Sequence, residues 1–261
     1  MKVLAVIPAR WGSSRFPGKP LAPILGKPMA QWVVEAALAA KLIDKVIVGT
    51  DDERIGRAAY RAGATVWFSK QEFKSGTDRC AAVARTEESD IVVNIQGDEP
   101  LIDPADLDSL VGFMSGPESA GYDIASLFYR GRPDQASDPN VVKLAIDPDE
   151  LRDRLGLRHE AIWFSRAPVE PISKTLVHVG VYAFRRDFLL RAVMLRPTLS
   201  EKLERLEQLR WLGRGAKMMM LMAKGPTAAV DVPEDVVRVE AVLLAQNRPQ
   251  TVPMAHFPEN R

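Results

Sequence analysis

Three cations lie close together near the start of the chain. Arg10, Arg15 and Lys19 belong to the segment PARWGSSRFPGKPL at residues 8–21, which follows the apolar run MKVLAVI at residues 1–7. A hydrophobic strand that leads into a basic loop rich in Gly, Ser and Pro commonly holds polyphosphate at the edge of an α/β sheet. The segment therefore predicts a phosphate-binding loop; the alternative is a solvated loop with scattered cations.

This loop does not match the P-loop motif, which requires G-x-x-x-x-G-K-[ST]. Here five residues separate Gly12 from Gly18, and Lys19 is followed by Pro20 instead of a Ser or Thr that could meet a magnesium ion. The chain also lacks G-x-G-x-x-G, so a dinucleotide site has no support. The phosphate-binding prediction therefore rests on the cations and on the preceding strand.

Two adjacent carboxylates follow a second apolar run, in the segment NIQGDEP at residues 94–100. A turn at the carboxyl end of a strand can hold a divalent cation there, and Gly97 lets the backbone approach a ligand closely. Asp98 is the better candidate ligand, because the turn can direct only one of two adjacent side chains at the site. The alternative is an acidic turn that happens to follow a strand.

A second carboxylate ligand is expected, because magnesium is usually held by one or two carboxylates together with substrate phosphates. Asp231 is the leading candidate, in the segment VDVPED at residues 230–235. An Asp before Pro-Glu-Asp is also an ordinary helix N-terminal cap, and taken alone the segment favours capping.

Two further segments could contact a substrate. Residues 74–79, KSGTDR, offer backbone N–H groups and hydroxyls at a turn into a helix, with a plain N-terminal cap as the alternative. His178 and Tyr182 lie on one face of an expected strand, since side chains alternate along strands. A lone histidine there is more often structural, and its pairing with tyrosine keeps a functional interpretation open. His159 and His256 lack metal-ligand spacing, so we expect no zinc site.

The elements that must position these residues alternate between strand and helix in the first half. We expect strands at residues 3–7, 45–48, 65–68 and 90–95, and helices at 29–40, 53–62, 77–86 and from 103 onward. Such alternation predicts parallel strands joined by right-handed helical crossovers, with ligands beyond the carboxyl ends of the strands. The loops after Ile7, Thr50, Phe68 and Ile95 should then share one rim of the sheet.

The second half is more mixed. We expect strands at residues 123–128, 141–146, 175–184 and 217–223, a charged helix at 200–211 with Leu203, Leu206 and Leu209 on one face, and a last helix at 233–245. Residues 246–261 contain three prolines without periodicity, which predicts an irregular tail.

Composition excludes several classes of protein. The 261 residues carry a formal net charge of +1, which argues against a general nucleic-acid binder. A single cysteine rules out an internal disulfide and fits a reducing compartment, so we expect a cytoplasmic protein. We also expect no secretory signal and no membrane span, because apolar runs stay short of the roughly 18 residues that a span needs.

Taken together, the motifs resemble those of the 3-deoxy-manno-octulosonate (Kdo) cytidylyltransferases, or CMP-Kdo synthetases. The matching elements are IPAR-x-x-S-x-R-x-PGKPL at 7–21, SGT-[ED]-R at 75–79, N-[VI]-QGDEP at 94–100, PN-x-VK at 139–143, FSRA at 164–167, H-x-G-x-Y at 178–182, LEQLR at 206–210 and VD-x-PED at 230–235. They occur in the family's order up to about residue 245. The departures are PVEP after FSRA, Val232 in place of a common Thr, and KLE at 202–204 in place of a frequent H-I-E; they cluster on the side of the sugar.

The resemblance implies an α/β fold: a mostly parallel, Rossmann-like nucleotidyltransferase sheet flanked by helices, with a smaller mixed α+β portion for sugar binding and dimerisation. We expect one domain over residues 1–245, with that portion inserted at roughly 125–215. The implied reaction activates Kdo with CTP to give CMP-Kdo and pyrophosphate for lipopolysaccharide biosynthesis, in a cytoplasmic homodimer that binds no nucleic acid or membrane.

The same resemblance implies roles for individual residues. The expected nucleotide-binding residues are Ala9, Arg10, Arg15, Lys19, Ser75, Gly76, Arg79, Gln96 and Asp98. Mg²⁺ would be held by Asp98 and Asp231, which with Arg10 and Lys19 form the expected catalytic set. The expected sugar-binding residues are Arg166, His178, Tyr182, Glu207 and Gln208. Arg166 suits the sugar's carboxylate, because a guanidinium pairs with a carboxylate through two hydrogen bonds.

Two alternatives remain. The chain could be a cytidylyltransferase for an amino variant of Kdo or for another acidic sugar. It could instead be a non-catalytic, nucleotide-binding regulatory protein. The presence of both Asp98 and Asp231 argues against the second alternative, because a mere binder has no need of a metal.

Overall fold

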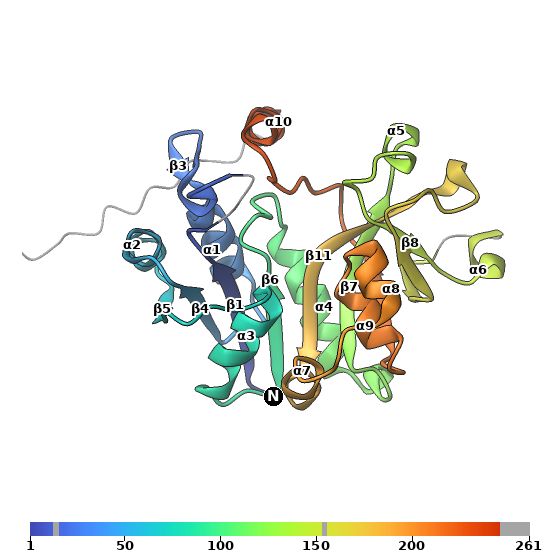
Figure 1. The fold of residues 1–261 in the computed structure, drawn as a ribbon, viewed down its shortest axis with the longest axis horizontal. Coiled ribbons are helices and arrows are strands. Elements are labelled where there is room, and N and C mark those ends of the chain that lie inside the picture. The colour runs from blue at the N-terminus through green and yellow to red at the C-terminus, as the bar shows by residue number, and fades with distance from the viewer. Residues whose placement is uncertain (13–15, 153–155, 246–261) are drawn as a thin grey trace, which may run out of the picture.

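The computed structural model describes residues 1–12, 16–152 and 156–245. Within them, ten strands form one central sheet in the order β5-β4-β1-β6-β11-β7-β12-β9, with β8 paired to β11 and β10 paired to β8 (Figure 1). Arg15 and the expected irregular tail at 246–261 lie outside the described residues.

The strands of this sheet are β1 (Val3–Ala9), β4 (Lys45–Thr50), β5 (Thr65–Phe68), β6 (Ile91–Ile95), β7 (Ile124–Arg130), β8 (Lys143–Ala145), β9 (Arg158–Glu160), β10 (Trp163–Ser165), β11 (Leu176–Arg185) and β12 (Met218–Met222). A separate two-stranded sheet pairs β2 (Pro23–Ile24) with β3 (Lys27–Pro28). The helices are α1 (Met29–Ala39), α2 (Glu53–Arg61), α3 (Gly76–Arg85), α4 (Pro104–Ser115), α5 (Pro133–Ala136), α6 (Pro148–Arg152), α7 (Arg186–Ala192), α8 (Leu199–Glu204), α9 (Gln208–Leu212) and α10 (Pro233–Ala245).

The first half forms the parallel sheet that the alternating pattern predicts. β1 pairs in parallel with β4 on one side and β6 on the other, and β4 pairs in parallel with β5. The strands read as near-continuous apolar runs because both faces of the sheet are covered. Along β1, Val3, Ala5 and Ile7 face α1, α2 and α4, whereas Leu4 and Val6 face the layer of α3, α7 and α9.

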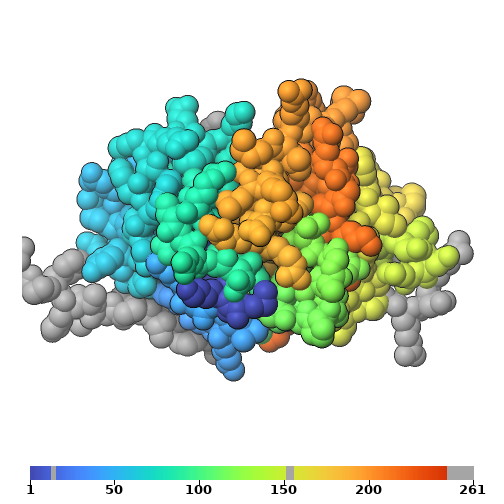
Figure 2. Space-filling view, turned by 90° about the horizontal axis from the view of Figure 1, so that it is seen from below, coloured from blue at the N-terminus to red at the C-terminus, as the bar shows by residue number. Residues whose placement is uncertain are grey.

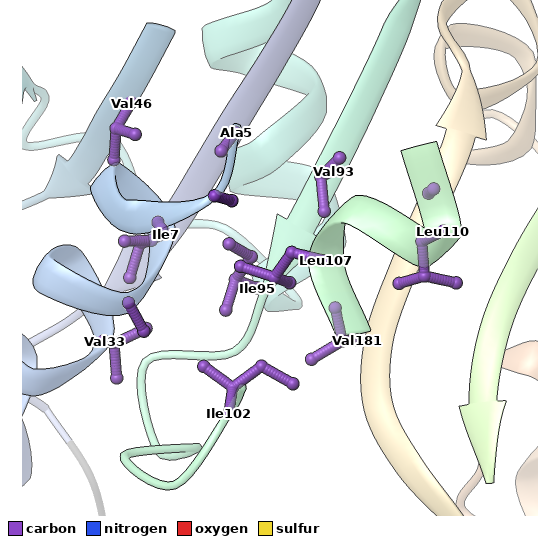
Figure 3. Packing of buried hydrophobic residues seen from close by; sticks show 14 of the residues in the cluster. Ala5, Ile7, Val33, Val46, Val93, Ile95, Ile102, Leu107, Leu110 and Val181 are labelled. Atoms are coloured by element: carbon purple, nitrogen blue, oxygen red, sulfur yellow. The ribbon is translucent and has the colours of Figure 1, made fainter. Parts of the chain in front are cut away.

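The packing between the sheet and the first helical layer is shown in Figure 3. Ile7 and Ile95, from neighbouring parallel strands, lie against Val33 of α1 and Leu107 of α4, and all four side chains are buried from solvent. This layer fixes the carboxyl ends of β1 and β6 relative to each other. Figure 2 views the opposite end of the sheet, where the N-terminal residues lie beside the turn into β6 and Lys2 N donates to Asp90 Oδ2 at 2.6 Å.

The second half continues the same sheet with mixed strand directions. β11 runs antiparallel to both β6 and β7, and β12 is parallel to β7. The register of β11 against β7 shifts between Val179 and Tyr182, so the regular strand pairing is interrupted next to the expected site residues His178 and Tyr182. The expected fold class, a mostly parallel sheet with a mixed second portion, is confirmed.

The expected single helix at residues 200–211 is wrong. The structure has two short helices, α8 and α9, because Arg205 adopts a left-handed conformation with φ 56° between them. Side-chain contacts on both sides explain the break: the Glu204 carboxylate accepts from Ser165 Oγ at 3.0 Å, and Glu207 turns toward α3. The expected leucine face is broken too, since Leu203 is 75% exposed while Leu206 and Leu209 are buried.

No helix in the described part of the chain combines the length and the apolar character that a membrane crossing requires.

The start of α2 carries a stability prediction. Asp52 caps the helix through Arg54 N at 2.8 Å and pairs with the Arg54 guanidinium at 2.7 Å. The hydrogen bond from Arg54 lowers the pKa of Asp52 to about 2. We expect Asp52→Asn to lower the free energy of unfolding at pH 7, because the variant loses the charge that pairs with Arg54. The loss should be only about 1 kcal/mol, because solvent partly screens an exposed guanidinium.

The pH dependence of this loss follows from the direction of the pKa shift. The pKa of Asp52 is lower in the folded chain than the value of about 3.9 in the unfolded chain, so its contribution is complete above about pH 5 and is lost as the pH falls toward 2. Urea unfolding of both proteins at pH 7, 5 and 3 measures it. A matched control is Asp134→Asn, because Asp134 pairs with Arg132 at 2.8 Å and both side chains are 65% exposed. A loss that stays constant down to pH 3 would contradict the assignment.

Candidate active site

A cavity of about 260 Å³ opens at the carboxyl ends of the parallel strands. Its lining includes side chains from the first loop, from the start of α3, from the turn after β6 and from the segment before α10. The lining residues that the sequence predicted are Ala9, Arg10, Lys19, Ser75, Gly76, Arg79, Gln96, Asp98 and Asp231. The structure therefore brings together the predicted nucleotide and metal residues that it describes.

The rim forms where three neighbouring parallel strands end. Ala9 at the end of β1 is in register with Thr50 at the end of β4, and β6 ends at Ile95, one residue after Asn94, which is in register with Val6 of β1. The turn after β6 approaches the end of β1 so closely that a Cβ on Gly97 would lie 3.0 Å from the carbonyl oxygen of Pro8. A glycine therefore fits this position with less crowding than any other residue, and the sequence placed a close approach here.

The start of α3 fulfils both interpretations of the segment at 74–79. Ser75 Oγ accepts from Asp78 N at 3.1 Å, and Asp78 Oδ2 accepts from Ser75 N at 3.1 Å, which forms a capping box. Ser75 also lines the cavity, together with Gly76. The helix cap thus places a hydroxyl and the first N–H groups of a ten-residue helix at the cavity.

Lys19 lies between the two predicted metal ligands. Its Nζ donates to Asp98 Oδ2 at 2.6 Å and to the carbonyl oxygen of Val230 at 2.9 Å, and lies 3.6 Å from Asp231 Oδ1. Gly18 permits this placement, because its φ of 71° is left-handed and a Cβ there would lie 2.7 Å from the Trp11 ring. One cation is thus shared by two carboxylates from distant parts of the chain.

The position of the Lys19 ammonium indicates that Asp98 and Asp231 could bind a shared magnesium ion. Asp98 and Asp231 converge on the same ammonium group, and Val230 N donates to the carbonyl oxygen of Asp98 at 2.9 Å, which holds the two segments together. Among the described residues no group of three or more His, Cys, Asp or Glu side chains is arranged to hold a metal. Two carboxylates completed by substrate phosphates are a usual donor set for Mg²⁺, so the residues fit the ion.

The Asp235 carboxylate accepts hydrogen bonds from two backbone N–H groups of the segment before α10. Its Oδ2 accepts from Asp231 N at 2.7 Å and from Val232 N at 3.0 Å. The carboxylate of Asp231 lies close enough to Lys19 for an ion pair.

Glu99, the neighbour of Asp98, is buried. Its burial together with the charge of Asp98 raises the pKa of Glu99 to about 8.

Asp51 is a site residue that the sequence reasoning missed. Its Oδ1 accepts from Trp11 N at 3.0 Å and its Oδ2 accepts from Arg79 Nη2 at 3.2 Å. Asp51 thus ties the base of the cationic loop to the buried guanidinium of Arg79, which lines the cavity. The signal was present, because Asp51 directly follows a strand whose end belongs to the shared rim.

The expected sugar-binding residues of β11 lie in an aromatic cluster. The His178 ring is 4.9 Å from Phe164 and 5.4 Å from Tyr182, and His178 Nε2 is 3.0 Å from Ser126 Oγ. Burial lowers the pKa of His178 to about 3, so the imidazole is neutral at physiological pH. Burial likewise raises the pKa of Tyr182.

Glu207 connects this side of the molecule to the cavity. Its carboxylate accepts from Ser75 Oγ at 3.0 Å and from Thr77 Oγ1 at 2.6 Å, and the neighbouring Gln208 is buried. Burial raises the pKa of Glu207, and the two hydroxyl donors oppose that shift.

Arg166 is held by a different set of contacts. Its Nε donates to the carbonyl oxygen of Glu204 at 3.1 Å, and its Nη1 donates to that of Pro139 at 2.9 Å. The fully buried Lys143 donates to the carbonyl oxygens of Asp138 and Arg166. It therefore holds the backbone of Arg166 close to the segment that accepts the Arg166 hydrogen bond. The motif PN-x-VK contains Lys143, but the sequence assigned no role to it.

Comparison with known proteins points to one family. A family model described as "Cytidylyltransferase" matches residues 4–218. The 3-deoxy-manno-octulosonate cytidylyltransferase of Bdellovibrio bacteriovorus is 40% identical over 258 residues, covering 94% of this chain and 99% of the relative. The protein of the same name from Solibacter usitatus is 42% identical over 253 residues, covering 94% and 95%.

Solved structures agree with these relatives. The structure of CMP:2-keto-3-deoxy-manno-octonic acid synthetase complexed with CTP superposes with a TM-score of 0.83 at 37% identity, covering 95% of this chain and all of the other. An apo UDP-glucose pyrophosphorylase superposes with a TM-score of 0.69 at 13% identity, covering 95% of this chain and 100% of the other, a likeness of fold alone.

Proposed function

The chain belongs to the cytidylyltransferase family, and on that premise we propose that it transfers CMP from CTP to Kdo and releases pyrophosphate, a step of lipopolysaccharide biosynthesis. The observation that carries the proposal is the convergence of Lys19, Asp98 and Asp231 at one cavity whose wall also contacts Glu207. In this proposal Lys19 serves the leaving pyrophosphate and the two carboxylates serve a metal ion. Ser75, which lines the cavity, is hydrogen-bonded to Glu207 of the proposed sugar pocket.

The reaction needs positioning and charge neutralisation more than covalent chemistry. The anomeric hydroxyl of the sugar loses its proton to solvent and its oxygen forms a new O–P bond to the α-phosphorus of CTP, while the bond from that phosphorus to the bridging oxygen of the pyrophosphate breaks in line. Arg10 and Lys19 line the cavity and would stabilise the charge that develops on pyrophosphate.

Asp98 and Asp231 would hold Mg²⁺, which when bound polarises phosphoryl oxygens and lowers the pKa of the attacking hydroxyl. Ser75, Gly76 and Ala9 would frame the cytosine and ribose, with Gln96 and Arg79 nearby. The backbone N–H groups and hydroxyl at the start of α3 support this placement, because they are fixed by the capping box before any ligand binds.

On the sugar side, the partly exposed guanidinium of Arg166 would bind the carboxylate of Kdo. The neutral His178 and the Tyr182 ring offer an apolar wall with polar edges, and Glu207 and Gln208 would accept and donate hydrogen bonds to sugar hydroxyls. These five residues decide which acidic sugar the enzyme takes.

A pyrophosphate-release assay with Mg²⁺ tests the proposal. CTP is combined in turn with Kdo, its amino variant and other acidic sugars, and UTP replaces CTP as the nucleotide control. We expect release with Kdo and CTP. Release only with the amino variant or another sugar would move the substrate to that alternative, whereas CTP binding in calorimetry without release from any sugar would favour the regulatory protein.

We also propose a homodimer in the cytoplasm. Ile162, Trp163 and Ile172 are 54%, 40% and 40% exposed near an apolar hollow of about 460 Å³ lined by Leu144 and Ile146, a surface suited to a second copy. A monomer at every concentration in analytical ultracentrifugation would contradict the dimer. The buried thiol of Cys80 suits a reducing compartment, and cell fractionation tests that location.

A further inference from the structure

A chain of hydrogen bonds runs from the wall of the nucleotide cavity to Glu207. Gln96 Nε2 donates to Asn94 Oδ1 at 3.1 Å, and Asn94 Nδ2 donates to Thr77 Oγ1 at 3.3 Å. Thr77 Oγ1 in turn donates to Glu207 Oε2 at 2.6 Å. Gln96 lines the cavity at one end, and Glu207 belongs to the expected sugar pocket at the other.

The chemistry of these groups gives the chain a single direction. An ionised carboxylate only accepts, so the proton of the Thr77 hydroxyl must point at Glu207. The hydroxyl oxygen is then left to accept, which requires the amide nitrogen of Asn94 to face it. Asn94 Oδ1 consequently faces the amide nitrogen of Gln96. Each group holds the next in one orientation, and all donors point toward Glu207.

Because these side chains are buried, any of them without a hydrogen-bond partner would destabilise the folded protein. Asn94 is 0% exposed and Thr77 is 2% exposed. The other residues of β6 are Ile and Val, as expected for a strand buried on both faces, so Asn94 is the polar exception in the strand. A buried amide without partners would destabilise the sheet, and its partners here are the groups that lead to Glu207.

Resting on the proposed function, we propose that Thr77, with Asn94 behind it, is the positioning residue that sets the Glu207 carboxylate at the boundary between nucleotide and sugar. Ser75 holds the other carboxylate oxygen from the cavity side, and Arg210 Nη2 lies 3.8 Å from it. Glu207 is the N-cap residue of a helix of five residues and follows the left-handed Arg205. The α3 hydroxyls therefore orient a carboxylate whose own element is short.

The experiment compares the two substrates of the enzyme in Thr77→Val. Valine keeps the shape of threonine and removes the hydrogen bond to Glu207. We expect the KM for Kdo to rise roughly 10- to 100-fold, the range for one hydrogen bond to a charged group, while the KM for CTP changes less than about threefold. Thr77→Ser keeps the hydroxyl and should restore the KM for Kdo.

A matched control is Thr86→Val at the other end of α3. Thr86 Oγ1 donates to the carbonyl oxygen of Val83 at 2.8 Å, so this variant loses one hydrogen bond of the same helix away from the cavity. We expect both KM values to stay at the wild-type level. An unchanged KM for Kdo in Thr77→Val, or equal rises in both KM values that serine does not reverse, would overturn the positioning role.

A second measurement keeps the inference testable if the wild-type chain accepts none of the acidic sugars, which would refute the proposed function alone. A double-mutant cycle then combines Thr77→Val with Glu207→Gln and measures urea unfolding. Non-additive losses of stability support the coupling between the two side chains. Strictly additive losses show that Thr77 does not hold Glu207 and overturn the inference.

Discussion

Replacing Asp98 with Asn lowers kcat for pyrophosphate release by at least about a hundredfold, the scale for losing one electrostatic stabiliser in a preorganised site. Asparagine keeps the shape of the side chain and removes its charge. The Asp98 carboxylate lies 2.6 Å from Lys19 Nζ at the cavity, where it would hold the proposed metal. The loss therefore reports on charge at the reacting phosphorus.

The measurement is steady-state turnover at saturating CTP and Kdo over a series of Mg²⁺ concentrations. Calorimetric titration of Mg²⁺ into the CTP-bound protein gives a second readout, in which we expect weaker binding by Asp98→Asn. Turnover near the wild-type level would remove Asp98 from both the catalytic set and the metal site.

The matched control for this variant is Asp103→Asn, five positions further along the same segment. Asp103 caps α4, and its Oδ1 accepts from Ala105 N at 2.8 Å. Asparagine caps a helix about as well as aspartate, so the same chemical change should leave both kcat and stability almost unaltered. A hundredfold loss in this control as well would show that the segment tolerates no amide and would void the comparison.

The first half of the fold could be predicted from local patterns. Each strand there is a short apolar run followed by a helical period, and such alternation permits only a few arrangements of parallel strands. The arrangement also places the strand ends at one rim, which is how Ala9, Gln96 and Asp98 come to line one cavity. Asp231 lines the same cavity from a distant segment. Its place there could be predicted only because Mg²⁺ is usually held by one or two carboxylates together with phosphates.

The rest depended on contacts that no local pattern records. Nothing in the residues around Arg205 breaks a helix, and the break arises because Glu204 and Glu207 bind partners on opposite sides of it. Tertiary contacts of this kind override helix propensity. For Asp51, the position after a strand marked it as a rim residue, but its two partners, Trp11 and Arg79, come from segments far apart in the chain and appear only in the fold.

The polar residues inside the sheet were the hardest to interpret. Asn94 belongs to a motif that the resemblance identifies, yet its task becomes visible only when Thr77 and Glu207 lie beside it. Lys143 received no role from its sequence motif, but it is fully buried and satisfied by backbone carbonyl oxygens. Burial of a charged group is a property of the assembled fold, so spacing alone could not reveal it.

Lys19→Met should produce two effects of opposite direction. The value of kcat/KM for CTP falls roughly 10²- to 10³-fold, because a cation beside the leaving pyrophosphate is lost. Binding of Mg²⁺ in the absence of nucleotide becomes tighter, because the Lys19 ammonium no longer competes for Asp98, at 2.6 Å, and Asp231, at 3.6 Å. Without the ammonium that they share, the two carboxylates repel each other more strongly, and a bound divalent ion relieves that repulsion.

Calorimetry with Mg²⁺ alone and steady-state kinetics with CTP separate these effects. Lys27→Met is the matched control: the Lys27 ammonium is similarly buried and pairs with Glu35 at 2.5 Å, but lies outside the cavity. That variant should lose stability while keeping kcat/KM and Mg²⁺ affinity. If Lys19→Met lost turnover and also bound Mg²⁺ more weakly than the wild type, the ammonium would be a support for the two carboxylates and not a competitor of the metal, and the charge arrangement proposed for the site would be wrong.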